Sequence, residues 1–237
     1  MDMNKWIEDV LAAEKKKALP VLSFPAVQKM GITVKELIDS SDKQAEAMKI
    51  VADSVPAAAS VSFMDLSVEA EAFGSKTVVT DDEVPTVVGA VIDEDTDPDD
   101  IFVPEVGAGR TGLYIDAIKK VAPQITDRPI FAGVIGPFSL SGRLMDVNEI
   151  MILCYEEPEL VHAVLDKTTG FITEYAKAFK EAGANGVVMA EPLAGLLPPD
   201  LVAEFSTQYV KRIVDAIQDD EFIVVYHNCG SSVVKAA

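Results

Sequence analysis

A histidine and a cysteine stand one residue apart near the end of the chain, in the segment Phe222-Ile-Val-Val-Tyr-His-Asn-Cys-Gly230. The apolar, β-branched run before His227 is typical of a buried strand, and Gly230 ends it. Because residues i and i+2 of a strand point to the same side, His227 and Cys229 are expected to project together from the carboxyl end of this strand. Imidazole nitrogen and thiolate sulfur are both zinc ligands. The pair therefore predicts half of a zinc site.

The further ligands that such a site needs are scarce, because the chain has only two histidines and two cysteines. Cys154 lies in a helix-like stretch, 150–155, and is expected to be a packing residue and not a ligand. His162 lies inside a long predicted helix and is expected to be a packing or surface residue. Glu191, which follows another apolar run, is the acidic candidate. The alternative for Cys229 is that it is a small buried hydrophobe at a strand end.

Composition limits the class of protein. The chain has 237 residues, of which 49% are hydrophobic, and one α/β barrel domain can absorb this length. The net charge of −19 disfavours nucleic acid and anionic membranes as partners. Two cysteines, the lack of an apolar run of transmembrane length and the lack of a leader-like N-terminus predict a cytoplasmic protein.

Helix and strand signals alternate along the chain, which predicts an α/β architecture with parallel strands. Thr33-Val-Lys-Glu36 and Ser41-Asp-Lys-Gln44 fit the capping-box pattern of a helix start. An acidic stretch at 93–100 lacks the glycine and distal glutamate of an EF-hand and is expected to be a solvated loop. The expected helices are 3–17, 33–39, 42–54, 111–121, 138–145, 147–156, 158–181 and 198–217; the expected strands are 20–23, 58–63, 129–134, 186–190 and 221–226, with a hairpin at 76–88.

Polar or special residues follow the predicted strands, and in a (β/α)₈ barrel the catalytic groups lie at such positions. These residues are Ser23, Asp65, Gly136, Pro137, Glu191, His227 and Cys229. A complete barrel of this type has about 250 residues, whereas this chain ends soon after the His-x-Cys strand. The prediction is a single TIM-barrel-type domain over residues 1–237, truncated after that strand.

Several of the other polar residues have plain structural interpretations. Asp65 is as well suited to cap a short helix as to take part in catalysis. Glu69 is interpreted either as a polar contributor at the barrel mouth or as a residue on the exposed face of that helix. Arg110 lies in the glycine-rich segment 107–112, which lacks the lysine and the preceding strand of a phosphate-binding loop. We interpret this segment as a flexible loop that could touch substrate.

Five segments carry a family resemblance, in the order 63–74, 133–138, 175–184, 191–192 and 227–230. Through them the chain resembles the uroporphyrinogen decarboxylase superfamily, and within it the corrinoid-dependent methyltransferases. The resemblance implies a TIM-barrel enzyme that moves a methyl group from a corrinoid, carried by a partner protein, to a small thiol such as coenzyme M. It also implies a zinc ion held by His227, Cys229 and a later cysteine that has no counterpart in this chain.

On this interpretation Asp65 and Glu191 are the catalytic candidates, and Gly136 and Pro137 are expected at the cofactor side of the rim. The decarboxylase branch of the superfamily is the first alternative. The resemblance implies that its members bind a polycarboxylate substrate through an arginine-rich early segment, and residues 20–28 of this chain hold no arginine. The second alternative is a non-catalytic homologue that binds a partner.

Overall fold

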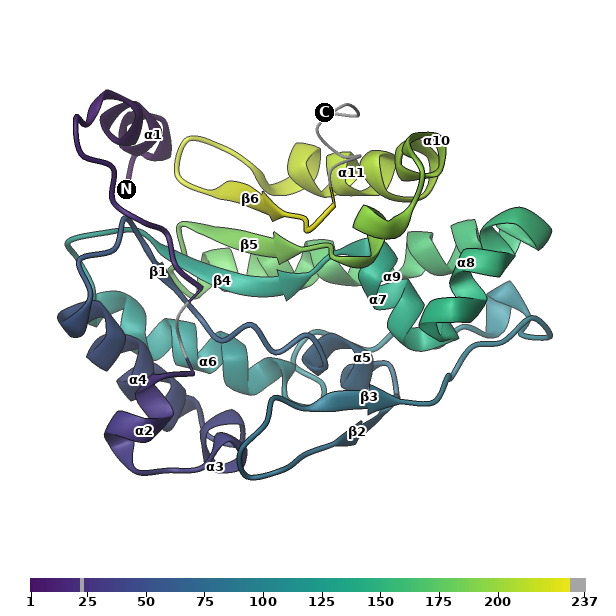
Figure 1. Ribbon diagram of the computed structural model, residues 1–237, viewed down its shortest axis with the longest axis horizontal. Helices are drawn as coiled ribbons and strands as arrows, with labels where there is room; N and C mark the ends of the chain where they lie inside the picture. Colours follow the sequence, from purple (N-terminus) through teal and green to yellow (C-terminus); the bar gives the residue numbers. More distant parts are fainter. Residues whose placement is uncertain (22–23, 231–237) are drawn as a thin grey trace.

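The computed structural model describes residues 1–21 and 24–230, and its centre is a parallel sheet of four strands in the order β1-β4-β5-β6 (Figure 1). Each strand pairs with the one that follows it in this sheet, as successive βα units do. The strands are β1 (Ser60–Val61), β4 (Ile130–Ile135), β5 (Gly186–Ala190) and β6 (Ile223–His227). The strand expected at 20–23 extends into residues 22 and 23, so it and Ser23 lie outside the described residues.

Helices connect the strands, as the alternating pattern predicts. They are α1 (Met3–Ala12), α2 (Ala26–Met30), α3 (Val34–Ile38), α4 (Ser41–Ser54), α5 (Val68–Ala72), α6 (Thr111–Val121), α7 (Pro137–Met145), α8 (Val147–Glu156), α9 (Pro158–Glu181), α10 (Pro199–Val202) and α11 (Gln208–Ile217). Short 3₁₀ turns are η1 (Pro98–Asp100), η2 (Ala122–Gln124) and η3 (Leu193–Leu196), and η4 (Ala203–Thr207) is a π-helical segment between α10 and α11.

Both faces of the sheet are covered. Alternate residues of β4 and β5, such as Ala132 and Val187, belong to the large core that the sheet forms with the surrounding helices. The residues between them, such as Phe131 and Val188, form a second cluster with Met3 of α1, against which Trp6 packs. All residues of β4 and β5 are buried, as expected for parallel strands with elements on both faces.

The predicted helix starts and ends are partly confirmed. The Thr33 capping box is present, with Thr33 Oγ1 accepting from the Glu36 N–H and Glu36 Oε2 accepting from the Thr33 N–H. The cap predicted at Ser41 is wrong. Ser40 has the extended backbone that a cap requires, and its Oγ accepts from the Lys43 N–H, so α4 begins one residue earlier.

Helix α1 is shorter than the expected 3–17. It ends at Ala12, and Lys16 Nζ donates to the carbonyl oxygens of Val10, at 2.9 Å, and Leu11, at 2.5 Å. These carbonyls belong to the last turn, where a helix has no further N–H groups of its own to offer. The Lys16 ammonium group therefore donates to carbonyl oxygens that would accept from backbone N–H groups in a longer helix.

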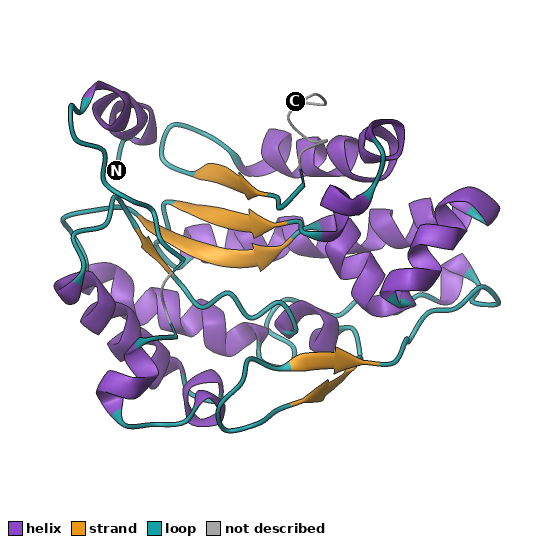
Figure 2. Cartoon of the chain, viewed as in Figure 1, coloured by secondary structure: helices purple, strands orange, loops and turns teal. Residues whose placement is uncertain are grey.

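The predicted hairpin is confirmed and lies apart from the parallel sheet (Figure 2). Strands β2 (Lys76–Val78) and β3 (Thr86–Val88) pair in antiparallel register. Between residues 1 and 230, leaving out 22 and 23, no helix has the length and hydropathy needed to cross a membrane.

Candidate functional site at the carboxyl ends of the strands

The carboxyl ends of β4, β5 and β6 meet at one edge of the sheet. Beyond the strands, the Gly136 N–H donates to the Ala190 oxygen at 2.7 Å, and the Glu191 N–H donates to the His227 oxygen at 2.9 Å. These bonds continue the sheet by one residue. The structure thus brings Gly136, Glu191 and His227 together, although 91 residues separate the first from the last.

His227 and Cys229 are both exposed at this edge. His227 is the last residue of β6, and Cys229 lies in the loop that follows. An accessible imidazole and an accessible thiol suit zinc, and they could fill two of its usual four positions. Within the described ranges no group of three or more His, Cys, Asp or Glu side chains could hold a metal ion.

The other histidine and cysteine have packing roles, as predicted. Cys154 is buried in the core, and burial raises the pKa of its thiol to about 12. His162 stacks on Phe205 with ring centroids 4.7 Å apart, and its Nδ1 lies 2.7 Å from the Tyr209 hydroxyl.

Glu191 is fully buried and points into the start of helix α7. Its Oε2 accepts from the Phe138 N–H at 3.1 Å, and its Oε1 accepts from the Ser139 N–H at 2.6 Å. These N–H groups lie in the first turn of α7, whose N-cap, Gly136, has no side chain to bond them. Burial raises the pKa of Glu191 to about 7, although the bonds from Ser139 and Phe138 oppose that shift. The side chain therefore acts as the missing cap.

Gly136 and Pro137 shape the same junction. A Cβ atom at Gly136 would overlap the Glu191 carboxylate. Pro137 occupies the first position of α7, where a missing N–H costs nothing and the fixed φ suits the helix. Both residues allow the strand β4 to turn directly into a helix whose N-terminus receives Glu191.

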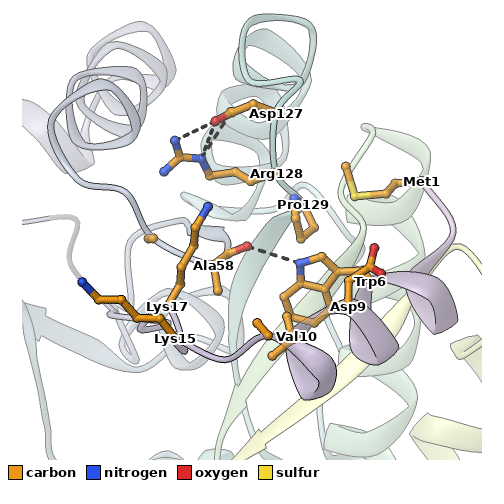
Figure 3. A pocket seen from close by; sticks show the side chains of 12 residues that line it. Met1, Trp6, Asp9, Val10, Lys15, Lys17, Ala58, Asp127, Arg128 and Pro129 are labelled. Carbon is orange, nitrogen blue, oxygen red and sulfur yellow. Dashed lines mark hydrogen bonds and ion pairs between the residues drawn. The ribbon is translucent and has the colours of Figure 1, made fainter.

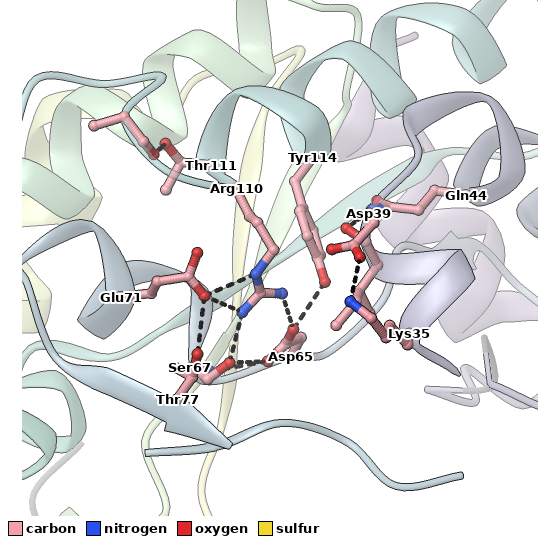
Figure 4. A network of polar contacts seen from close by, with 12 residues as sticks. Lys35, Asp39, Gln44, Asp65, Ser67, Glu71, Thr77, Arg110, Thr111 and Tyr114 are labelled. Atoms are coloured by element: carbon pink, nitrogen blue, oxygen red, sulfur yellow. Dashed lines mark hydrogen bonds and ion pairs between the residues drawn. The ribbon is translucent and has the colours of Figure 1, made fainter. Parts of the chain in front are cut away.

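Asp65 lies in a buried ionic network with Arg110 (Figure 4). Its Oδ2 is 2.5 Å from Arg110 Nη1 and accepts from the Tyr114 hydroxyl at 3.0 Å, while its Oδ1 accepts from the Ser67 hydroxyl at 2.6 Å. The other edge of the guanidinium contacts Glu71 Oε2, at 2.8 Å from Nε. Burial acts to lower the pKa of Arg110, but Glu71 and Asp65 together outweigh it and raise that pKa, and burial raises the pKa of Tyr114.

This network corrects two expectations. Arg110 is only 8% exposed and directly precedes α6, so it does not lie in a flexible loop. The N-cap position of α5 is Ser67 and not Asp65, although Asp65 Oδ1 accepts from the Ser67 N–H, at 3.1 Å, in the turn that precedes the helix. A sequence signal for the pairing exists, since an acid in the apolar stretch that begins at Phe63 needs a partner if it is buried.

Glu69 is also buried, so the interpretation that places it on the exposed face of the helix is wrong. Helix α5 packs against α7, and the Glu69 side chain reaches the end of β4. Its Oε1 accepts from the Ile135 N–H at 3.0 Å, and its Oε2 has no hydrogen-bond partner among the described residues. Burial, with a smaller contribution from the charge of Asp65, raises the pKa of Glu69 to about 7.

Comparison with known proteins agrees with this architecture. Residues 7–236 match the model of the uroporphyrinogen decarboxylase (URO-D) family. The chain belongs to the URO-D family. The fold is shared with a methyltransferase from Methanosarcina mazei, at a TM-score of 0.86 and 22% sequence identity, over 98% of this chain and 71% of that one. The predicted TIM-barrel-type α/β class is therefore confirmed, and the four-stranded parallel sheet of the described residues is compatible with part of such a barrel.

Two branches of the family occur among the relatives. Methylcobamide:CoM methyltransferase MtbA of Methanosarcina acetivorans is 31% identical over 172 residues, which cover 71% of this chain and 50% of the relative. The uroporphyrinogen decarboxylase of Paraburkholderia phytofirmans is 27% identical, over 71% of this chain and 49% of the relative. The chain thus spans about half the length of these URO-D family relatives.

Gly136→Ala is expected to destabilise this URO-D family member by about 1–3 kcal/mol, because the added methyl group would displace the buried Glu191 carboxylate. Urea denaturation measures the change. Gly170→Ala is the matched control: Gly170 lies within α9, a Cβ there meets nothing within 4 Å, and alanine should stabilise by up to about 1 kcal/mol. Equal effects of the two substitutions would contradict the proposed close approach.

Glu69→Gln is expected to change how stability depends on pH. Folding raises the pKa of Glu69 from 4.5 to about 7, so the native state binds this proton more tightly than the unfolded chain. The resulting stabilisation is complete below about pH 4.5 and is lost as pH rises to about 7. Relative to Glu69→Gln, wild type should lose up to about 3 kcal/mol over that window. Urea denaturation across the window tests this, and parallel profiles would refute it.

A pocket of about 260 Å³ lies at the opposite end of the sheet (Figure 3). Trp6 of α1 forms one wall, and its indole N–H donates to the Ala58 oxygen at 3.3 Å. Ala58 and Pro129 precede β1 and β4, so the pocket is at the amino ends of the strands. Active sites of TIM barrels lie at the carboxyl ends, and the pocket is therefore separate from the candidate site.

Proposed function

We propose that this chain is a zinc-dependent methyltransferase that moves a methyl group from a corrinoid to a thiol such as coenzyme M. The observation that carries the proposal is the exposed pair His227 and Cys229 at the carboxyl end of β6, next to the end of β5. The similarity to a methylcobamide:CoM methyltransferase supports the same choice.

His227 and Cys229 would hold the zinc through an imidazole nitrogen and a thiolate. The chemistry that bound zinc supplies is to keep the substrate sulfur deprotonated, since a free thiol has a pKa near 8.5 and is mostly protonated at neutral pH. The positions that this pair leaves open would go to the substrate sulfur and to ligands from outside the described residues. Glu191 fixes the start of α7 beside them, and we keep it with Asp65 as a candidate catalytic residue.

The methyl donor would approach the same edge of the sheet. We propose that the corrinoid is carried by a partner protein that docks over this end, with Gly136 and Pro137 at the cofactor side of the rim. Glu191 accepts from two N–H groups at the start of α7 and so holds the β4–α7 junction in place, and Gly136 has no side chain that would obstruct a docking cofactor.

A decarboxylase function is the alternative, since uroporphyrinogen decarboxylases are also among the relatives. Such an enzyme must neutralise the carboxylates of its substrate. Arg110, near this edge, already contacts Asp65 and Glu71, and the buried Glu69 adds a further acid beside them. The surroundings of Asp65 thus favour the methyltransferase.

The test is a pair of assays on the full chain. With methylcobalamin and coenzyme M we expect formation of methyl-coenzyme M, and with uroporphyrinogen we expect no release of CO₂. Decarboxylation without methyl transfer would support the alternative branch. A well-folded protein that binds no zinc and is inactive in both assays would instead favour a non-catalytic homologue that binds a partner.

A further inference from the structure

The residue between the two candidate ligands, Asn228, is bonded on three sides. Its Nδ2 donates to the Glu191 carbonyl oxygen at 2.8 Å and to the Tyr226 hydroxyl at 3.3 Å. Its Oδ1 accepts from the Gly230 N–H at 2.6 Å. Only one orientation of the amide satisfies both backbone partners, because the Glu191 carbonyl can only accept and the Gly230 N–H can only donate.

The backbone of Glu191 bonds the end of β6 and the residue after it, once through its N–H and once through its carbonyl. Its N–H donates to the His227 oxygen at 2.9 Å, and its carbonyl accepts from Asn228. The first bond belongs to the continuation of the sheet. The second bond comes from the side chain of Asn228, the first residue after β6. It takes the place of the backbone pairing with β5, which stops at the end of the strand.

The loop that follows β6 also contacts η3. The backbones of Gly195, in η3, and Gly230 approach so closely that a Cβ atom at Gly195 would lie 2.6 Å from the Gly230 nitrogen and 2.9 Å from Asn228 Oδ1. No L side chain fits at that separation. The loop that carries Cys229 is therefore confined between η3 on one side and the end of β5 on the other.

We infer that Asn228 is a positioning residue that sets the orientation in which His227 and Cys229 present their ligand atoms to the metal. The inference rests on the proposed function. Cys229 lies beyond the last strand residue, so the pairing of β6 with β5 no longer fixes its position relative to His227. The bonds of Asn228 to the Glu191 carbonyl and to the Gly230 N–H hold the backbone on both sides of Cys229 instead.

Asparagine suits this position because it offers a donor and an acceptor on a short side chain. Alanine removes both bonds and leaves the Glu191 carbonyl and the Gly230 N–H without this partner. The expected consequence is that the positions of His227 and Cys229 relative to each other are less well fixed. Removal of a group that hydrogen-bonds to a metal ligand and orients it typically weakens metal binding by roughly 10–100-fold.

The experiment measures zinc affinity of the full chain by competition with a chelating dye. Asn228→Ala should bind zinc about 10–100-fold more weakly than wild type. Gly195→Ala, which pushes on the same loop from η3, should also weaken binding. Asn148→Ala is the matched control, because Asn148 is an exposed asparagine on α8, and its affinity should equal that of wild type.

A spectroscopic readout separates positioning from a loss of folding. Cobalt(II) in place of zinc gives a thiolate-to-metal absorption band and a visible band that reports the coordination geometry. At saturating cobalt, Asn228→Ala should alter these bands while the protein still melts cooperatively. Should Asn228→Ala fail to fold, Gly195→Ala decides the question, and wild-type affinity and bands in that variant would overturn the inference.

The outcomes distinguish this inference from the proposed function. If wild type binds zinc and His227→Ala and Cys229→Ser do not, the metal pair is established. Wild-type affinity and cobalt bands in Asn228→Ala would then overturn the positioning role alone. Wild-type protein that binds neither zinc nor cobalt would overturn both.

Discussion

His227→Ala and Cys229→Ser are each expected to abolish zinc binding and methyl transfer to coenzyme M. Each change removes one of the two candidate ligands that the described residues place at the carboxyl end of β6. Loss of groups that merely orient metal ligands costs roughly 10–100-fold in affinity, so loss of a ligand itself should cost more than about 100-fold. Elemental analysis of the purified proteins measures the first effect, and the assay with methylcobalamin measures the second.

Cys154→Ala provides the matched control for these variants. Cys154 is the other cysteine of the chain, and it is buried among apolar side chains of the core. Its replacement should reduce stability slightly and leave the zinc content unchanged. Zinc that persisted in Cys229→Ser but vanished in Cys154→Ala would show that the metal binds elsewhere, and the proposed centre would have to be abandoned.

Arg110→Met is expected to reduce the free energy of unfolding by about 3–5 kcal/mol. The Asp65 side chain is 0% exposed, and Arg110 Nη1, 2.5 Å away, is its cationic partner. Removal of the guanidinium leaves a buried carboxylate without a countercharge, a state far more costly than the loss of an exposed ion pair. Urea denaturation at neutral pH measures the difference.

Arg212→Met is the control for this substitution. Arg212 pairs with Asp166 at 2.5 Å, but the two side chains are 52% and 58% exposed, so water screens the interaction. The expected loss is about 0–1 kcal/mol. Similar losses for Arg110→Met and Arg212→Met would mean that the Asp65 network contributes no more than a surface pair. The buried network would then not be what holds α5 and the start of α6 together.

The local pattern of the sequence predicted the elements that rely on local chemistry. Helices α6 and α9 and strand β5 have the bounds expected from Pro158, Gly183 and the apolar run 186–190. Proline and glycine act on their own backbone, and a β-branched run selects extended structure wherever it is buried. The family resemblance was also readable, because its segments are short and contiguous.

The tertiary structure decided which polar groups meet. Arg110 pairs with an aspartate 45 residues away, and Glu191 caps a helix that begins 54 residues before it. No local rule fixes such partners, because they depend on how the strands lie side by side and on which groups lose water together. Sequence spacing alone put His227 and Cys229 at the end of a strand. The bonds of Asn228, which stands between them in the chain, to the Glu191 carbonyl and the Gly230 N–H could be found only in the folded structure.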